Sequence, residues 1–171
     1  ELAVGQLLGG QLLAQGQDFA YTLDGDLEGG IEYENFNAAG GCVEITGVSV
    51  HPGSAKDAME NALLIAMELN ARLPAGETPA HTEVYEGFFH LESLSGDMAF
   101  AKMRYIIRDH DMDRFQARKT QLEQAVRDTQ AAHPKAALKL ELKDSYYNMS
   151  GQLKDCMHLV ENANRAAEMA G

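Results

Sequence analysis

The chain has 171 residues, of which 45% are hydrophobic and 23% are charged, a balance that is ordinary for a soluble globular protein. Its formal net charge of −12 argues against nucleic acid as a partner. The longest apolar run, Ala62–Met67, is far too short to cross a bilayer, so no membrane partner is expected. Two distant cysteines, Cys42 and Cys156, provide no disulfide framework, and no signal peptide is visible. Together these features predict a cytoplasmic protein.

The N-terminal part of the chain carries weak structural signals. Residues 1–17 contain several glycines and almost no charge, so we expect no well-defined element there. Residues 18–23 predict a short strand, and residues 31–38 predict an extended segment. The pair Gly40-Gly41 should then break or bulge this segment.

A strand followed by a helix is the clearest pattern in the next part of the chain. Residues 42–50 alternate between apolar and polar side chains, which is typical of a strand, and Pro52 should end it. A helix is expected over residues 55–72, because its apolar residues fall on one stripe. Ser54, with Asp57 three residues later, is the expected N-cap of this helix.

The remaining elements follow from the same two periodicities. Alternation predicts strands, and a single apolar stripe predicts a helix. The expected elements are strands over 87–94, 100–109 and 136–143, a helix capped by Asp111 or Asp113 that runs to about Ala132, and a third helix over 151–169.

From Gly41 to Asn148 the predicted order is strand, helix, strand, strand, helix, strand. Each strand has one apolar face and each helix has one apolar stripe. Two helices that cover one face of a four-stranded antiparallel sheet satisfy all of these patterns at once. The sequence therefore predicts an α+β fold, a ferredoxin-like βαββαβ sandwich whose other sheet face is solvated or binds something.

His51 is the first candidate site residue. It lies between the predicted strand over 42–50 and the predicted helix over 55–72. Backbone N–H groups and the positive end of the helix dipole would meet there. An imidazole in that place suits the binding of a negative or developing-negative oxygen. The alternative is a turn histidine without a function.

Arg108 and Asn148 are the other two candidates, and both lie at predicted strand ends. Arg108 falls on the sheet face without helices, where a guanidinium can bind a carboxylate through two hydrogen bonds. The alternative is a surface ion pair with Asp109 or Glu44. Asn148 could donate to a substrate carbonyl, or it could be a strand-end amide that satisfies backbone groups.

No motif in the chain indicates a metal site or a catalytic nucleophile. None of the six histidines has a recognised metal-ligand spacing, and the aspartates that surround His110 are better explained as helix caps. The sequence also contains no Gly-x-Ser-x-Gly, phosphate-loop or dinucleotide motif.

Six blocks of sequence, in order and with plausible spacing, resemble the peptidase T family of two-zinc tripeptide aminopeptidases. The blocks are Asp18–Gly25, Glu34–Ala39, Val50–Lys56, Tyr85–Leu91, Tyr105–Asp109 and Asp144–Met149. The third predicted helix also resembles the one that follows there. The resemblance runs from about Asp18 to Met149, and residues 1–17 do not clearly match.

The resemblance implies a domain organisation. Residues 39–149 would be the lid or dimerisation domain, which forms a homodimer. Residues 1–38 and 150–171 would be flanks that belong to the catalytic domain of the parent chain, so that the sequence is a piece excised from a longer one. That catalytic domain and a short peptide substrate are the implied partners.

The resemblance also implies roles for single residues. His51 matches the histidine that stabilises the oxyanion, in an active site expected to be that of the partner subunit. Arg108 matches the arginine that holds the peptide's C-terminal carboxylate, and Asn148 is a weaker match to a substrate-binding residue.

Departures from the family pattern limit what this chain can do by itself. The family's two zinc ions are bound by residues before and after this region, and neither a His-x-Asp nor a Gly-Gly-Thr-Asp-Gly segment occurs here. We therefore expect this chain to bind no metal and to be inactive alone. The alternative function is a stand-alone ferredoxin-like module that dimerises and binds a small ligand.

Overall fold

A computed structural model describes residue 21 and residues 30–170. The chain divides into two units, Tyr33–Cys156 and the combination of Glu1–Glu32 with Met157–Gly171. In the second of these, helix α4 spans His158–Ala170, and the Tyr21 hydroxyl donates to the Leu159 carbonyl at 2.8 Å. The segment 1–17 and, apart from Tyr21, the strand expected over 18–23 lie outside the described residues.

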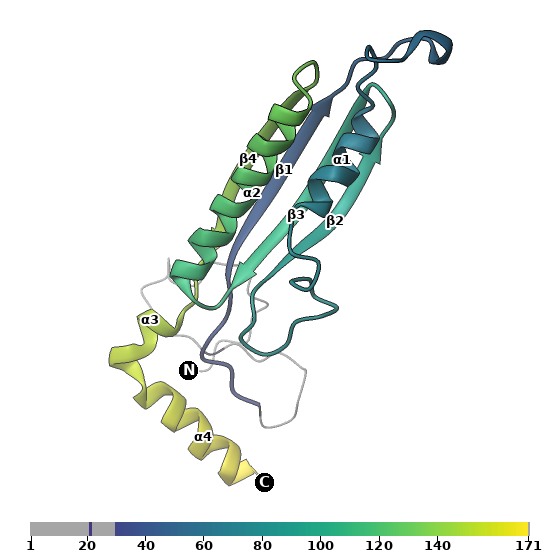
Figure 1. Cartoon of the computed structure of the whole chain (residues 1–171). Helices are drawn as coiled ribbons and strands as arrows, with labels where there is room; N and C mark the ends of the chain where they lie inside the picture. The colour runs from purple at the N-terminus through teal and green to yellow at the C-terminus, as the bar shows by residue number, and fades with distance from the viewer. Residues whose placement is uncertain (1–20, 22–29, 171) are drawn as a thin grey trace, which may run out of the picture. The chain divides into compact units, whose positions relative to one another are not determined.

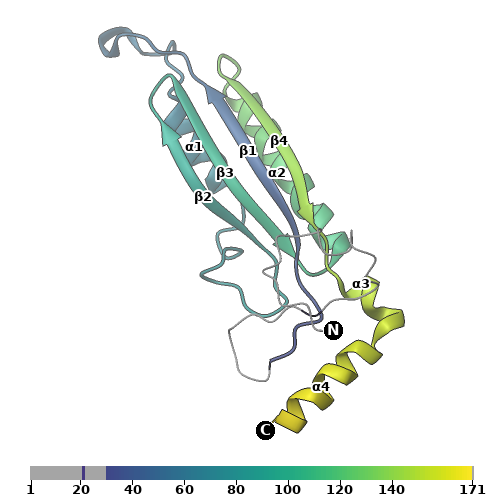
Figure 2. The ribbon, with the colours of Figure 1, turned by 180° about the vertical axis from the view of Figure 1, so that it is seen from behind.

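The unit Tyr33–Cys156 is built on one antiparallel sheet with the strand order β2-β3-β1-β4 (Figure 1). The strands are Asn37–Thr46 (β1), Phe88–Gly96 (β2), Phe100–Asp109 (β3) and Ala137–Tyr146 (β4). Helices Ala62–Ala71 (α1) and Met112–Ala132 (α2) cover one face, and Figure 2 shows the other face open. The predicted ferredoxin-like α+β fold is confirmed.

Alternation along the strands places the core between the sheet and the two helices. Val43 and Ile45 of β1 are fully buried, and so are Met103 and Ile107 of β3. The helices contribute a matching set of buried apolar side chains, which comprises Ala62, Ile65, Ala66, Leu69, Phe115, Leu122, Ala125 and Val126. Burial of each Val, Leu, Ile, Met or Phe side chain in this core stabilises the fold by about 1.5–3 kcal/mol, before the loss of chain entropy is subtracted.

The break expected at Gly40-Gly41 is absent, because β1 continues through both glycines and pairs with β3 and β4. A Cβ at Gly41 would lie 3.0 Å from Leu122 Cδ2, so the glycine allows α2 to approach the sheet closely. The irregularity in β1–β4 pairing lies earlier, between Ala38 and Ala39, and leaves Ser145 of β4 as the extra residue.

The predicted start of the first helix is wrong. Pro52–Ser54 form a single 3-10 turn, and α1 begins only at Ala62. The N-cap is Asn61, whose side chain accepts the backbone N–H groups of Leu63 at 3.0 Å and Leu64 at 3.4 Å. A bridge between Val48 and Glu60 closes the segment between them into a loop, which prevents the helix from starting at Ala55.

The third helix, expected over 151–169, is interrupted. It consists of Ser150–Leu153 (α3), a 3-10 turn Lys154–Cys156 (η3), and α4. The interruption coincides with the point at which the chain passes from one unit to the other, between Cys156 and Met157.

A histidine joins the two helices that cover the sheet. His133, the C-cap residue of α2, places Nδ1 2.7 Å from a Glu60 oxygen and Nε2 2.8 Å from a Glu68 oxygen. Burial lowers the pKa of His133, but the hydrogen bonds to Glu68 and Glu60 outweigh burial and raise it above its usual value. The hydrogen bond to His133, with a second from Arg72, lowers the pKa of Glu68.

The capping interaction of Asn61 can be tested directly. Asn61→Ala should lower the free energy of unfolding by about 1 kcal/mol, because two N–H groups at the start of α1 lose their acceptor. Ser54→Ala should change it by less than about 0.5 kcal/mol, since Ser54 caps no α-helix. Urea denaturation followed by circular dichroism measures both, and a larger effect at Ser54 would contradict the assignment.

The ion pairs of His133 should make stability depend on pH. A raised folded-state pKa contributes stability that is complete below the unfolded value of about 6.5 and is lost as pH rises through the folded value. His133→Gln should therefore destabilise the chain more at about pH 6 than at about pH 9. Urea denaturation of both proteins at the two pH values measures this, and an equal loss at both would show that His133 acts through packing alone.

Candidate functional site

Arg108 lies on the open sheet face, near the end of β3, and its register partners are Ala38 on β1 and Phe88 on β2. Its guanidinium carbon lies 5.9 Å from the centroid of the Phe36 ring, a distance typical of a cation–π contact. The Nε atom is buried and has no hydrogen-bond partner. In the part of the chain that the structure describes, Arg108 forms no salt bridge.

The two carboxylates considered as partners of Arg108 are bound elsewhere. Asp109 accepts from Arg118 Nε at 2.8 Å, and Glu44 accepts from Lys102 Nζ at 2.8 Å. The pair with Lys102 lowers the pKa of Glu44. The ion-pair alternative for Arg108 is therefore absent from the structure, and a positive group remains available beside an aromatic ring.

A buried ion pair beneath this strand end explains why Asp109 is not available to Arg108. Asp109 points to the helix side of the sheet and is 1% exposed. Arg118 of α2 donates to Asp109 and to Glu77, and it lies over the Phe89 ring at 5.4 Å. The side chain of Asp109 also accepts the Asp111 N–H at 3.0 Å. The carboxylate next to Arg108 in sequence thus anchors α2 to the sheet.

Aromatic rings surround the space beside Arg108. Phe36 contacts Phe88 edge-on at 5.6 Å between centroids, and it contacts the His110 ring at 4.1 Å. The ring centroid of Tyr85 lies 4.9 Å from that of His110. The Nδ1 atom of His110 is buried and has no hydrogen-bond partner. Arg108 and His110 therefore both pack on Phe36, which holds the strand end in a largely apolar setting.

Asn148 belongs to a network of amide groups. Its Nδ2 donates to the His110 carbonyl at 3.3 Å, and its Oδ1 accepts the Ser150 N–H at 2.9 Å and the Asn35 N–H at 3.4 Å. Its own backbone N–H donates to Asn37 Oδ1 at 2.9 Å. The amide thus satisfies backbone groups, as one of the two sequence-based interpretations supposed. Its contact with a substrate stays a prediction.

His51 is exposed and lies on the loop between β1 and α1. The expected neighbourhood is wrong, because β1 ends at Thr46 and the three-residue turn after His51 supplies no helix dipole. The imidazole instead caps that turn, and its Nδ1 accepts the Gly53 N–H at 3.1 Å. A neutral ring that accepts at Nδ1 carries its proton on Nε2. His51 therefore presents an N–H donor on the side away from the turn.

His51 and Arg108 lie at opposite ends of the sheet. Arg108 is paired with Ala38 at the start of β1, whereas His51 follows Thr46 at its end. A strand rises about 3.4 Å per residue, so Ala38 and Thr46 are about 27 Å apart. In Figure 1 the segment between β1 and α1 extends away from the sheet, which adds to this separation.

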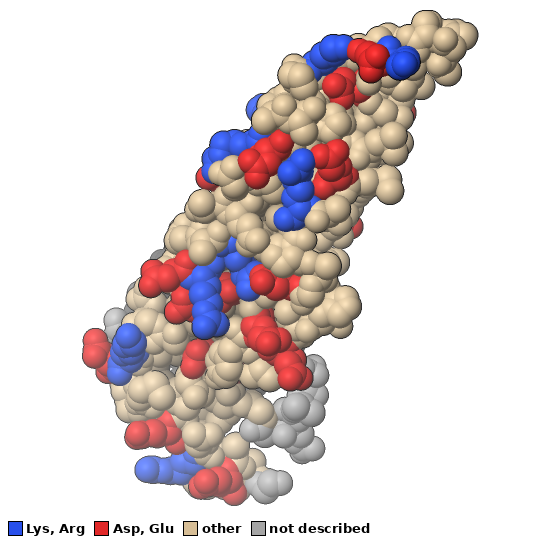
Figure 3. Space-filling view, viewed as in Figure 1, with Lys and Arg blue, Asp and Glu red and all other residues tan. Residues whose placement is uncertain are grey.

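The described residues offer no metal site, since no three His, Cys, Asp or Glu side chains among them are placed to hold an ion. The described helices also include none that is long and apolar enough to cross a membrane. On the helical side, acidic and basic side chains lie next to one another and form no large basic patch (Figure 3).

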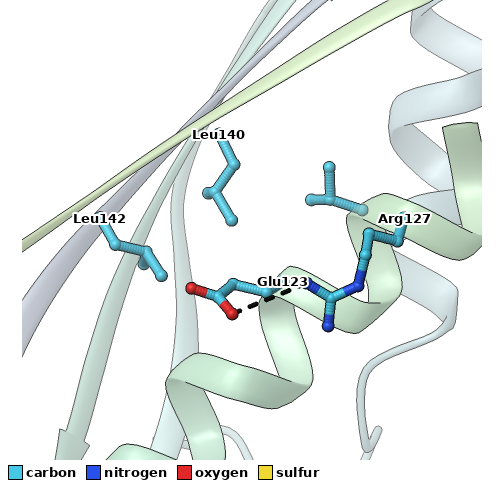
Figure 4. Close-up of a pocket in the computed structure, with 5 residues that line it drawn as sticks. Glu123, Arg127, Leu140 and Leu142 are labelled. Carbon is cyan, nitrogen blue, oxygen red and sulfur yellow. Dashed lines mark ion pairs between the residues drawn. The ribbon is translucent and has the colours of Figure 1, made fainter.

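An open groove lies between α2 and β4 and contains none of the predicted site residues (Figure 4). It is lined by Glu123, Val126, Arg127, Leu140 and Leu142. The two leucines belong to the helix face of the sheet and are partly exposed there. The Glu123–Arg127 pair, at 3.7 Å, lies beside them.

Sequence reasoning missed Asn37 and Arg118. Asn37 is 1% exposed, and its amide donates to the carbonyls of Asp109 at 3.1 Å and His110 at 3.0 Å. Asparagine is depleted in strands, so an Asn at the start of an apolar strand was a usable signal. Arg118 gave no such signal, because the sequence does not distinguish a buried, ion-paired arginine on a helix from a surface arginine.

Comparison with known proteins identifies this unit. A family model described as a peptidase dimerisation domain matches residues 33–134. The chain belongs to this family of peptidase dimerisation domains. The resemblance inferred from six sequence blocks is thereby confirmed at the level of the family.

The chain is similar in sequence to curated proteins named peptidase T. The chain is 48% identical over 153 residues to peptidase T of Brevibacillus brevis and 47% identical over 156 residues to peptidase T of Halothermothrix orenii. These matches cover 90% and 91% of the chain but only 37% and 38% of the relatives. The chain thus spans less than two fifths of the length of these relatives.

Solved structures support the fold. Aminopeptidase PepT from Bacillus cereus matches with a TM-score of 0.74 at 22% identity, and a tripeptidase from Staphylococcus aureus matches with a TM-score of 0.76 at 17% identity. Each match covers 90% of this chain and 41% of the other chain. Likeness at these identities demonstrates the shared fold.

Gly87 tests the close packing beneath the strand end of the dimerisation domain. A Cβ there would lie 2.1 Å from Asp109 Oδ2 and 2.6 Å from the Arg108 carbonyl oxygen. Gly87→Ala should therefore lower the free energy of unfolding by about 2–3 kcal/mol. The matched control is Gly40→Ala, where a Cβ meets no atom within 4 Å, and it should be neutral or slightly stabilising. Chemical denaturation compares them, and equal effects would contradict the packing described.

Proposed function

We propose that this chain is the lid and dimerisation domain of a zinc-dependent tripeptide aminopeptidase like peptidase T. Two observations support the proposal: the family match over residues 33–134 and the relatives named peptidase T. In this proposal residues 39–149 form the lid, and residues 1–38 and 150–171 belong to the catalytic domain of the same protein. The enzyme would be cytoplasmic, and its substrates would be short peptides.

Arg108 would bind the C-terminal carboxylate of the peptide. Its lack of a salt bridge, in the described residues, and its support by the Phe36 ring are what such a role requires. Each charge-assisted hydrogen bond from a guanidinium to a carboxylate is worth about 1.5–3 kcal/mol. A longer peptide would place its carboxylate elsewhere, so the same contact would select for length. One amide hydrogen of Asn148 has no partner in the described part and would donate to a peptide carbonyl.

His51 would stabilise the oxyanion that forms when the scissile carbonyl is attacked. Because Nδ1 accepts the Gly53 N–H, the ring presents its Nε2–H group as a donor, and donors of this kind act on developing negative charge. Removal of one such donor typically costs about 10²–10³ in turnover. The side chain is exposed and lies on a loop, so it can reach a site outside its own domain.

The proposal of an active site shared between subunits rests on the distance between His51 and Arg108. An extended tripeptide spans about 10 Å, whereas β1 alone separates the two residues by about 27 Å. One peptide cannot contact both side chains of the same lid. If both act on one substrate, His51 and Arg108 come from different subunits, and the enzyme is a homodimer whose active sites each combine two chains.

The surface next to β2 is suited to the dimer. The outer face of α1, which covers this side of the sheet, exposes the apolar side chains Leu64 and Met67 by 62% and 61%. The edge strand β2 contains no lysine or proline, whereas the opposite edge strand β4 carries Lys139 and Lys143. Lysines protect a sheet edge against pairing, so β2 is the edge left open to a second copy.

Zinc would be bound by the catalytic domain. The described residues of this chain contain no suitable ligand set, so the lid contributes binding and charge stabilisation rather than a metal site. Alone, this chain is therefore predicted to hydrolyse no peptide.

A complementation experiment tests the shared site in a full-length peptidase that contains this chain. His51→Ala and Arg108→Ala homodimers should each lose most tripeptidase activity. When they are mixed and allowed to exchange subunits, about half of the dimers are mixed, and each mixed dimer has one intact site. About a quarter of the wild-type activity should return.

The control is each variant refolded or exchanged with itself, which should recover nothing. If both residues act within one subunit, every site in a mixed dimer carries one defect and no activity returns. That result, with dimers and exchange verified by light scattering and mass spectrometry, would contradict the shared site.

A further inference from the structure

The end of β3, which carries Arg108, is held by side-chain amides. Asn37 Nδ2 donates to the carbonyl oxygens of Asp109 at 3.1 Å and His110 at 3.0 Å. Asn148 Nδ2 adds a hydrogen bond of 3.3 Å to the His110 carbonyl. The backbone directly after Arg108 is thus fixed by donors that come from two other segments.

The same amides join the segments by which the chain enters and leaves the sheet unit. Asn37 Oδ1 accepts the Asn148 N–H at 2.9 Å, and Asn35 Oδ1 accepts the Met149 N–H at 2.7 Å. The Asn35 N–H in turn donates to Asn148 Oδ1 at 3.4 Å. Asn37 lies at the centre of this amide network, since it bonds to both the strand end and the exit segment.

Asn37 is also linked to the Arg108 guanidinium through Phe36, its neighbour in sequence. The Phe36 ring contacts both the Arg108 guanidinium and the His110 ring. The position of this ring depends on the backbone that the amide network holds. Asn37 itself is 1% exposed, so it cannot touch a peptide. Any effect that it has on the binding of the peptide carboxylate must pass through the carboxylate-binding residue, Arg108.

We propose that Asn37 is a positioning residue for Arg108, an inference that rests on the proposed role of Arg108 in binding the peptide carboxylate. The amide holds the backbone after Arg108 and the Phe36 ring beside it, and it thereby sets where the guanidinium meets the carboxylate. Two hydrogen bonds to a carboxylate require a fixed fork geometry, so a small displacement of the strand end weakens both.

The test uses the full-length peptidase and a pair of substrates, a tripeptide with a free carboxylate and the same tripeptide as its C-terminal amide. The readout is the ratio of kcat/KM for the acid to that for the amide. Arg108→Ala should lower this ratio by about 10- to 100-fold. Asn37→Asp keeps the acceptor for Asn148 but sets a carboxylate oxygen against two carbonyl oxygens, and it should lower the ratio about tenfold, mainly through the KM of the acid.

A double variant separates positioning from a general loss of structure. In Asn37→Asp/Arg108→Ala the ratio should equal that of Arg108→Ala alone, because the asparagine affects the carboxylate only through the arginine, and an effect through Asn148 would change acid and amide alike. The matched control is Asn61→Ala, which also removes an amide that binds backbone groups but at the other end of the sheet, and it should leave the ratio unchanged. If Asn37→Asp shows no cooperative thermal transition, Asn37→Ser replaces it, since its hydroxyl adds no charge.

Any of four results would overturn the inference. A folded Asn37 variant with the wild-type ratio would show that the amide does not position Arg108. A loss that persists in full in the Arg108→Ala background, or that Asn61→Ala reproduces, would show a general structural effect. If Arg108→Ala itself keeps the wild-type ratio, the carboxylate contact of the proposed function fails, and the positioning role fails with it.

Discussion

The antiparallel register of β1 between β3 and β4 determines where every candidate residue lies. Ala38 at the start of β1 is opposite Arg108, and Thr46 at its end leads into the loop that carries His51. Because β1 is a central strand, bonded on both sides, a slip of one residue would reverse every side chain between core and open face. The distance between Arg108 and the start of the loop that carries His51 is therefore as rigid as the sheet itself. If both residues act on one tripeptide, as proposed, this separation requires that they come from different subunits.

A buried ion pair keeps the acidic neighbour of Arg108 away from the open face of the sheet. Asp109 and Arg118 neutralise each other beneath the sheet, which leaves Arg108 on the other face without a carboxylate beside it. Such a pair is weak support for stability, because the loss of water around two charges offsets most of their attraction, but removal of one partner is strongly destabilising. Here the pair holds Asp109, the acidic neighbour of Arg108, on the helix side of the sheet. Strand alternation and this pair together explain how adjacent charged residues of opposite sign avoid each other.

The sequence predicted what depends on local periodicity and failed where distant groups decide. The alternation of Met103, Tyr105 and Ile107 gave β3 with its bounds, because each residue needs only a buried face. The start of α1 was missed because Ser54 fits a local N-cap pattern, whereas the real start depends on a bridge between Val48 and Glu60. Arg108 and His51 could be named from their positions and the resemblance. The amide network could not, because Asn37 and Asn148 are more than a hundred residues apart and meet only after the sheet has formed.

The two proposed functional residues differ in how firmly the fold holds them, and each arrangement suits the role proposed for the residue. A cation that binds the terminal carboxylate selects peptides by their length only if the cation stays at a fixed place. Arg108 has that place at a strand end tied down by amides and an aromatic ring. Stabilisation of an oxyanion in another subunit requires a donor that projects beyond its own domain. His51 has such a position on a loop whose neck is closed by the Val48–Glu60 bridge and whose imidazole is oriented by the Gly53 N–H. Under the proposed roles, a lid built in this way would couple peptide length to catalysis only when two copies meet, and dimerisation and specificity would then belong to the same domain.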